Sequence, residues 1–144
     1  MGMEKEVFIG DVITEKRQKM KIRFQVADVT KPLMSVKRIA EKGNDVSFGP
    51  KVEDNYIIQK ETGKKVMMKP KGRGSYVMEA RLNGGGPTEI TVDSGAEENV
   101  CPWEWGSEFA TKPPGAGMER KFKSASGESI KHYGERNARV IAPF

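Results

Sequence analysis

A carboxylate, a hydroxyl and a glycine stand in consecutive positions at the end of an apolar stretch of the chain. Asp93, Ser94 and Gly95 follow Ile90-Thr91-Val92, which indicates a buried strand. An ionised Asp at the end of such a strand must be hydrogen-bonded, because burying an unpaired charge is costly. Gly95 has no Cβ, so its backbone can approach the carboxylate and donate an N–H, and the Ser94 hydroxyl can hydrogen-bond locally. The segment therefore predicts acid–base chemistry at Asp93, although Asp-Ser-Gly is also common in ordinary turns.

Residue counts exclude several other chemistries. The 144-residue chain has one cysteine, Cys101, and one histidine, His132. An intrachain disulfide, a cysteine zinc cage and a two-histidine metal site within one chain are therefore excluded. The sequence contains neither a G-x-x-x-x-G-K-[ST] phosphate loop nor a G-x-S-x-G nucleophile elbow. Carboxylates and hydroxyls remain for catalysis, and neither a metal nor a cofactor is expected.

The elements that must position this segment are predicted to be short strands. Sixteen Gly and eight Pro predict many turns, hence an all-β architecture that is mostly antiparallel with one short helix. Polar and apolar residues alternate over residues 21–29, as in a half-buried strand. Further strands are expected at residues 7–13, 45–49, 55–59, 66–68, 76–82, 88–92 and 138–141. A charged turn is expected at residues 14–18 and an irregular loop at residues 106–119.

One segment has helical rather than strand periodicity. Val36, Ile39 and Ala40 share one helical face, which predicts a helix within residues 33–43 that ends at Gly43. Residues 69–75 are basic and rich in glycine, and are the clearest internal boundary. Near the end of the chain, residues 120–123 and 129–133 predict a hairpin whose tip is residues 124–128.

Three segments resemble a known protease family. Val92-Asp93-Ser94-Gly95-Ala96, which follows the strand predicted at residues 76–82, resembles the active-site loop of retropepsin-like aspartic proteases of retroviruses, retrotransposons and related cellular proteins. The predicted hairpin with its tip at residues 124–128 resembles the family's flap, which closes over bound peptide. Residues 24–36 with residues 45–48 resemble the family's C-terminal half: a strand, two apolar residues and a small one, a helix, and a closing strand.

The order of these segments differs from that of the family, in which the Asp loop comes first and the helix half last. The resemblance therefore implies a circularly permuted retropepsin-like fold in a single domain, residues 1–144. Residues 1–68 would correspond to the family's C-terminal half, residues 69–75 to the joining turn, and residues 76–144 to the N-terminal half with the Asp loop and flap. Termini that lie close together can be joined in this way. A chain cut across two tandem copies in a polyprotein would give the same order.

The resemblance implies an aspartic endopeptidase that acts on extended polypeptides, its own precursor among them. Such an enzyme needs two carboxylates that share one proton, one acting as base toward a water molecule and the other donating to the peptide carbonyl. The sequence has no second Asp-[Ser/Thr]-Gly, so a homodimer is expected to supply the pair. The implied catalytic residues are Asp93, Ser94 and Gly95. The implied substrate-binding residues are Ala96, Glu97 and Glu98 and, at the flap tip, Ser126, Gly127 and Glu128.

Two positions depart from the family pattern. Ser35 stands where the family usually has a glycine after its two apolar residues. Val36 stands where the family often has an arginine, which would form an ion pair with Glu97. Lys37 and Arg38 are the candidates to replace that arginine.

Uneven charge leaves a second class of function open. Residues 1–72 carry 16 Lys and Arg against 10 Asp and Glu, whereas residues 73–144 carry 9 against 10. A basic half is compatible with a small β-barrel that binds nucleic acid. However, the basic residues alternate with acidic and apolar ones and no aromatic ladder accompanies them, which favours a solvated face. A catalytically inactive retropepsin-like domain used for dimerisation is the other alternative.

Neither a membrane partner nor export is expected. No apolar run approaches the roughly 18 residues that a membrane span requires, and the first residues lack the apolar stretch of a signal peptide. The sequence does not identify the compartment, and it is compatible with a location inside a cell or a virus-like particle.

Overall fold

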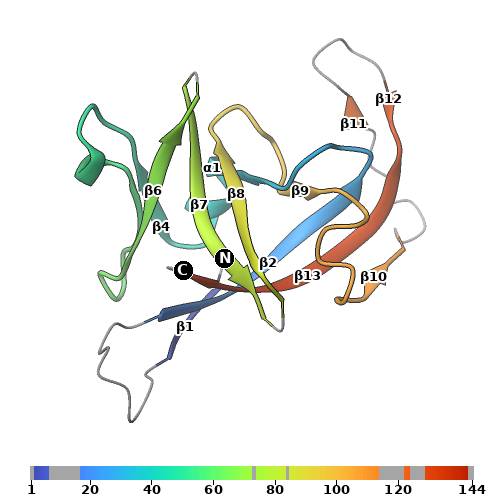
Figure 1. Ribbon diagram of the computed structural model, residues 1–144, viewed down its shortest axis with the longest axis horizontal. Coiled ribbons are helices and arrows are strands. Elements are labelled where there is room, and N and C mark those ends of the chain that lie inside the picture. Colours follow the sequence, from blue (N-terminus) through green and yellow to red (C-terminus); the bar gives the residue numbers. More distant parts are fainter. Residues whose placement is uncertain are drawn as a thin grey trace.

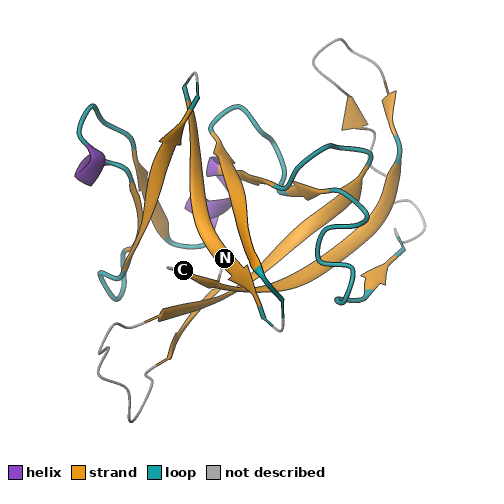
Figure 2. Cartoon of the chain, in the orientation of Figure 1, coloured by secondary structure: helices purple, strands orange, loops and turns teal. Residues whose placement is uncertain are grey.

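The computed structural model describes residues 2–6, 17–72, 74–83, 85–113, 122–123 and 129–142. In this part of the chain the structure is mostly β-sheet with one short α-helix (Figures 1 and 2), so the all-β prediction is confirmed. No helix within these ranges is long and apolar enough to cross a membrane.

Thirteen strands occur in the described residues, and two parallel pairings join distant parts of the chain. The strands are β1 (Gly2–Glu6), β2 (Arg17–Ala27), β3 (Leu33–Ser35), β4 (Asn44–Ser47), β5 (Tyr56–Gln59), β6 (Lys65–Lys71), β7 (Ser75–Leu82), β8 (Pro87–Asp93), β9 (Val100–Cys101), β10 (Thr111–Lys112), β11 (Phe122–Lys123), β12 (Ser129–Ile130) and β13 (His132–Ala142). The helix α1 (Val36–Glu41) follows β3 directly, and the 3-10 helix η1 (Val52–Asp54) precedes β5. The large sheet has the order β10-β13-β2-β9-β3-β8-β7-β6-β5-β4, with β1 beside β2. Within it β3 runs parallel to β8, and β2 runs parallel to β9.

The core lies where β2 and β13 cross the hairpin of β7 and β8 (Figure 1). Alternation along β2 buries Ile22, Phe24 and Val26 and exposes Lys21 and Arg23, as expected for a strand that covers a core on one face. The Phe24 ring packs edge-on against Trp105 with 4.9 Å between ring centroids. This core fixes β8, and hence the Asp93 segment at its end.

The helix begins later than the sequence predicts. Residues Leu33–Ser35 pair with β8 as a strand, so α1 starts at Val36. Ile39 is buried as expected, but Ala40 is exposed, because a helix of 6 residues presents only a narrow face to the sheet. The predicted end is confirmed: Gly43 has φ +85° and donates its N–H to the Ala40 carbonyl over 3.1 Å.

The predicted connector at residues 69–75 is mostly strand. β6 continues to Lys71 and β7 begins at Ser75, so the connection between the two strands is shorter than predicted. Pro70 is tolerated in β6 because β5 pairs with that strand only as far as Met67, so no neighbouring carbonyl requires an N–H there. The pairing of Pro70 with Tyr76 extends the hairpin, and this pairing outweighs the turn preference of the local sequence.

The beginning of the chain also differs from expectation. The predicted strand at residues 7–13 lies outside the described residues, and the strand that is described, β1, pairs with residues 17–21 of β2. Residues 17 and 18 were predicted in a turn and instead belong to β2. Their pairing with β13 on the other side explains the difference, because Gln18 lies opposite Ala142.

Two predictions for the second half are confirmed in part. The arms of the hairpin are present as β11 and β12, with Phe122 opposite Ile130, and the hairpin lies above the beginning of β13 in Figure 1. Its tip, residues 124–128, lies outside the described residues. Residues 106–113 are irregular as predicted except for β10, which pairs with β13.

Candidate active site

Asp93 is the last residue of β8 and lies beside the junction of β3 and α1. The parallel register places Ser35 next to Asp93 and Leu33 next to Thr91. Ile90 and Val92 point into the core and are 0% and 4% exposed. Because side chains alternate along a strand, Thr91 and Asp93 project from the opposite face, where both are half-buried.

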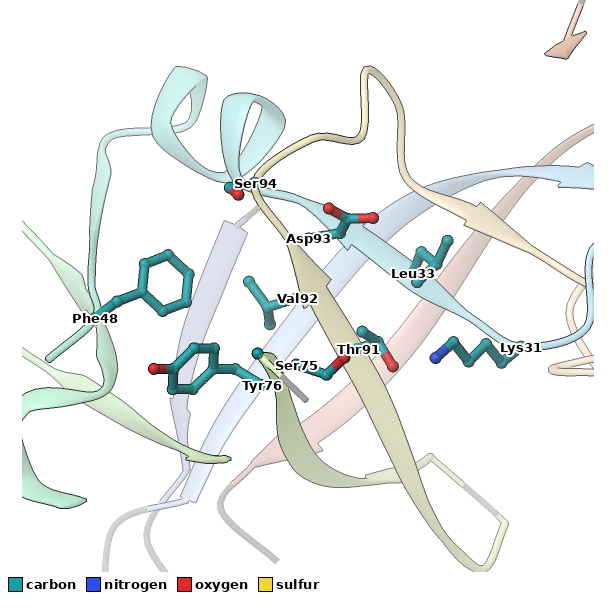
Figure 3. A pocket seen from close by; sticks show the side chains of 10 residues that line it. Lys31, Leu33, Phe48, Ser75, Tyr76, Thr91, Val92, Asp93 and Ser94 are labelled. Atoms are coloured by element: carbon teal, nitrogen blue, oxygen red, sulfur yellow. The ribbon is translucent and has the colours of Figure 1, made fainter. Parts of the chain in front are cut away.

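That face borders a pocket of about 380 Å³ (Figure 3). Phe48 and Tyr76 form one end, with 4.7 Å between their ring centroids. Lys31 and Thr91 lie at the other end. Among the residues that the structure describes, Asp93 is the only carboxylate that lines this pocket.

The backbone after β8 folds back onto the Asp93 carboxylate. The Gly95 N–H donates to Asp93 Oδ1 over 2.8 Å, which is the contact expected at this glycine. A Cβ at Gly95 would lie 3.4 Å from the same oxygen, so the turn fits closely around the carboxylate. Ser94 differs from expectation: it is exposed, and its hydroxyl makes no hydrogen bond with the described part of the chain. In Figure 3 the Ser94 side chain points away from Asp93.

Ser35, rather than Ser94, supplies the hydroxyl that holds this loop. Ser35 is fully buried, and its hydroxyl donates to the Ala96 carbonyl over 2.7 Å. The same oxygen caps α1 by accepting from the Arg38 backbone N–H over 3.2 Å. The Ser35 N–H donates to Asn99 Oδ1 over 2.7 Å. Ser35 therefore connects the Asp93 loop to the start of the helix.

Replacing Ser35 by Ala is expected to lower the free energy of unfolding by about 2 kcal/mol. The change removes a helix cap, worth about 1 kcal/mol, and leaves the Ala96 carbonyl without its donor, which costs about 1 kcal/mol more. Urea denaturation measures the loss. Ser47→Ala is the matched control, because Ser47 is half-buried in β4 and its loss should stay within about 0.5 kcal/mol. Equal effects of the two substitutions would contradict the role given to the Ser35 hydroxyl.

The two glutamates after the loop form ion pairs with α1. Lys37 Nζ lies 3.1 Å from Glu97 Oε2, so of the two candidates, Lys37 and Arg38, it is Lys37 that pairs with Glu97. Arg38 pairs with Glu98, and its guanidinium also lies 2.9 Å from Glu41. Hydrogen bonds to Glu98 and Glu41 raise the pKa of Arg38. The ion pair between Lys37 and Glu97 is exposed to solvent and contributes little stability. The ion pair between Arg38 and Glu98 is better shielded from solvent, because the Glu98 side chain is only 16% exposed.

The structure does not bring all the predicted site residues together. Ala96, Glu97 and Glu98 do not line the Asp93 pocket, and both glutamates extend toward α1 instead. Ser126, Gly127 and Glu128 lie outside the described residues. Contacts of these six residues with a substrate stay a prediction.

Cys101 lies in the short strand after the loop and is buried. Burial raises the pKa of its thiol to about 11, an effect that the nearby Arg136 guanidinium only partly offsets, so the thiol is neutral at physiological pH. Arg136 is itself buried, and it donates to the carbonyls of Trp103 and Trp105 and to the Thr111 hydroxyl. Both side chains hold the segment after the loop in place.

Most residues that line the pocket, Lys31 and Thr91 among them, were not predicted as site residues from the sequence. Alternation along β8 could have identified Thr91, because it lies two residues before Asp93 on the same face. Lys31 reaches the pocket only through the pairing of β3 with β8, and no local pattern reveals that pairing.

Among the described residues, no group of three or more His, Cys, Asp or Glu side chains could hold a metal ion. Comparison with protein-family models, curated proteins and solved structures gives no match.

Proposed function

We propose that this chain is an aspartic endopeptidase of the retropepsin-like type, with an active site that forms when two copies associate. One observation carries the proposal: Asp93 ends a buried strand, accepts the Gly95 N–H, and faces an open pocket with its carboxylate. A carboxylate held by its own backbone and open on the other side can bind a water molecule and a peptide carbonyl.

The arrangement of the two halves supports the permuted fold. Residues 33–41, from the half that corresponds to the family's C-terminal part, lie directly beside Asp93 through the parallel pairing of β3 and β8. The turn at residues 72–74 joins β6 to β7 in one hairpin, which is what a join between two neighbouring termini requires. The pairing of β3 with β8 beside the Asp loop supports this proposal.

The proposed chemistry needs two copies of Asp93. Two carboxylates at hydrogen-bonding distance cannot both ionise readily, so the pair holds one proton. The ionised Asp93 takes a proton from a water molecule as the water oxygen bonds to the peptide carbonyl carbon. The protonated Asp93 of the second copy donates its proton to the carbonyl oxygen. The diol then collapses: the newly protonated Asp93 gives its proton to the amide nitrogen, the ionised Asp93 of the second copy takes a proton from a diol hydroxyl, and the C–N bond breaks. The pair again holds one proton.

The substrate is proposed to be an extended polypeptide. The hairpin of β11 and β12, with Ser126, Gly127 and Glu128 near its tip, would cover the peptide, while Ala96, Glu97 and Glu98 would contact its backbone. Lys37, whose ammonium already pairs with Glu97, would then help to hold that part of the loop in place.

The nucleic-acid alternative receives less support from the structure. Lys69 Nζ lies 2.5 Å from Glu79, and Lys71 pairs with Glu89. Much of the basic charge of β6 is therefore balanced by its own hairpin partner and by β8, and is less available to a phosphate backbone.

The proposal is tested with the purified chain and an unfolded polypeptide. Cleavage should be blocked by a pepstatin-type inhibitor, which occupies the paired carboxylates. At low protein concentration the rate should rise with the square of that concentration, because two copies make one site. A stable dimer that binds neither inhibitor nor substrate and cleaves nothing would favour the inactive dimerisation domain instead.

A further inference from the structure

The wall of the Asp93 pocket carries a lysine that has no ion-pair partner among the described residues. Lys31 is exposed, lines the pocket, and forms no ion pair with any residue that the structure describes. Other lysines near the loop differ, because Lys37 is joined to Glu97. The ammonium group of Lys31 is thus available to a charged ligand.

The Lys31 ammonium group lies on the Thr91 side of the pocket that Asp93 also lines. Thr91 precedes Asp93 by two residues on the same face of β8, a separation of about 7 Å along the strand. Leu33 lies beside Thr91 in the register of β3, and the Thr91 N–H donates to the Pro32 carbonyl over 3.2 Å, which fixes the segment after Lys31. Figure 3 shows the nitrogen end of the Lys31 side chain pointing toward Thr91.

The three side chains have complementary properties for one type of ligand. Leu33 is half-buried and offers an apolar surface to methylene groups. The Thr91 hydroxyl can donate a hydrogen bond, and Lys31 supplies a positive charge. The opposite end of the pocket, with Phe48 and Tyr76, is aromatic. Only the Lys31 end therefore matches a short chain that ends in a carboxylate.

We propose that Lys31, Leu33 and Thr91 form a subsite that selects an acidic side chain, Asp or Glu, at a substrate residue flanking the bond to be cleaved. The inference rests on the proposed proteolytic function and names its substrate class. In the dimer, two Lys31 side chains would outweigh the single negative charge of a carboxylate pair that holds one proton. The site would thus attract an acidic peptide despite containing Asp93.

The test compares two peptides that differ only by Glu against Gln at a residue flanking the cleaved bond. The wild-type protein should show a kcat/KM about fivefold higher for the Glu peptide, a factor that corresponds to roughly 1 kcal/mol. In Lys31→Met the ratio should fall to about one. Lys42→Met is the matched control, because Lys42 is likewise exposed and without an ion pair among the described residues, but lies outside this pocket; it should keep the wild-type ratio.

The salt dependence of the preference for the Glu peptide is a second measurement. A lysine with a purely structural role would not make this preference depend on salt. Raising the ionic strength to about 1 M shortens the screening length to about 3 Å, so the preference for Glu should shrink in the wild-type protein. The Lys31→Met ratio should be insensitive to salt.

Failure of the subsite and failure of the proteolytic proposal give different results. Cleavage with no preference for Glu, or with a preference that Lys31→Met leaves intact, overturns the subsite while the protease proposal stands. Binding is measured separately with Asp93→Asn protein, by the fluorescence anisotropy of labelled Glu and Gln peptides. A Lys31-dependent preference for the Glu peptide in that protein, without any cleavage by the wild type, supports the subsite and overturns the protease proposal. Absence of both cleavage and preference overturns both.

Discussion

Asp93→Asn is expected to lower kcat/KM for polypeptide cleavage by about 10³-fold or more while the protein stays folded. The amide cannot take a proton from water, so a dimer of this variant has no general base. The fold should persist because an Asn side chain keeps the oxygen that accepts the Gly95 N–H, and the change in unfolding free energy should stay below about 1 kcal/mol. Initial cleavage rates and urea denaturation of the same preparation measure the two effects.

The control for this substitution is Asp45→Asn. Asp45 is exposed on β4 and does not line the Asp93 pocket. Its carboxylate forms an exposed ion pair with Lys60, with 3.4 Å between Oδ1 and Nζ. Its replacement should leave cleavage within about twofold of the wild-type rate. Full activity in the Asp93→Asn protein would refute the protease assignment.

Mixing the wild-type protein with the Asp93→Asn protein tests whether one active site is shared between two copies. With a threefold excess of Asp93→Asn subunits, random exchange leaves about one sixteenth of the dimers fully wild type, whereas independent subunits would keep about one quarter of the activity. Activity that follows the smaller fraction would support a shared pair of carboxylates. Activity that follows the larger fraction would contradict it.

Gly134→Ala is expected to lower the free energy of unfolding by about 3 to 4 kcal/mol, which is a large part of the total for a domain of this size. Gly134 has φ +145°, and a Cβ there would lie 2.0 Å from the Lys112 carbonyl oxygen and 3.1 Å from Pro113 Cα. Both are backbone atoms, so the overlap cannot be relieved by rotating a side chain. β10 would have to separate from β13, where Lys112 pairs with Glu135.

Gly63→Ala separates backbone strain from this overlap. Gly63 also has positive φ, +72°, but a Cβ there would meet no atom within 4 Å. Its substitution should cost only about 1 kcal/mol, the penalty of the left-handed conformation. Thermal and urea denaturation of both variants measure the difference, and similar losses for the two glycines would show that β10 moves away from Gly134 at little cost.

The parts of the fold that could be predicted from the sequence depend on local patterns. The alternation along β2 and the helix stop at Gly43 each involve residues close together in the chain, and both agree with the structure. The Gly95 contact with Asp93 is similarly local, since it spans two residues.

The parts that could not be predicted depend on distant pairings. Ser35 is recognisable as an important residue only once Ala96 and Asn99 lie beside it. The local sequence of residues 69–71 is typical of a connector, but in the structure these residues pair with β7 as a strand. Lys31 belongs to the Asp93 pocket only because β3 lies against β8. A single sequence gives no direct sign of these contacts, whose free energy outweighs the local preferences.

The pairing of β2 with β13 has a consequence for how the protein acquires its structure. Met20 lies opposite Val140, so the central strand β2 pairs with a strand that is about 100 residues later in the sequence. During synthesis on a ribosome, β2 therefore emerges long before β13 and remains without that neighbour until β13 has also been made. Such long-range closure places folding in the slow range of milliseconds to seconds, and the apolar face of β2 is meanwhile open to chaperones or to other nascent chains.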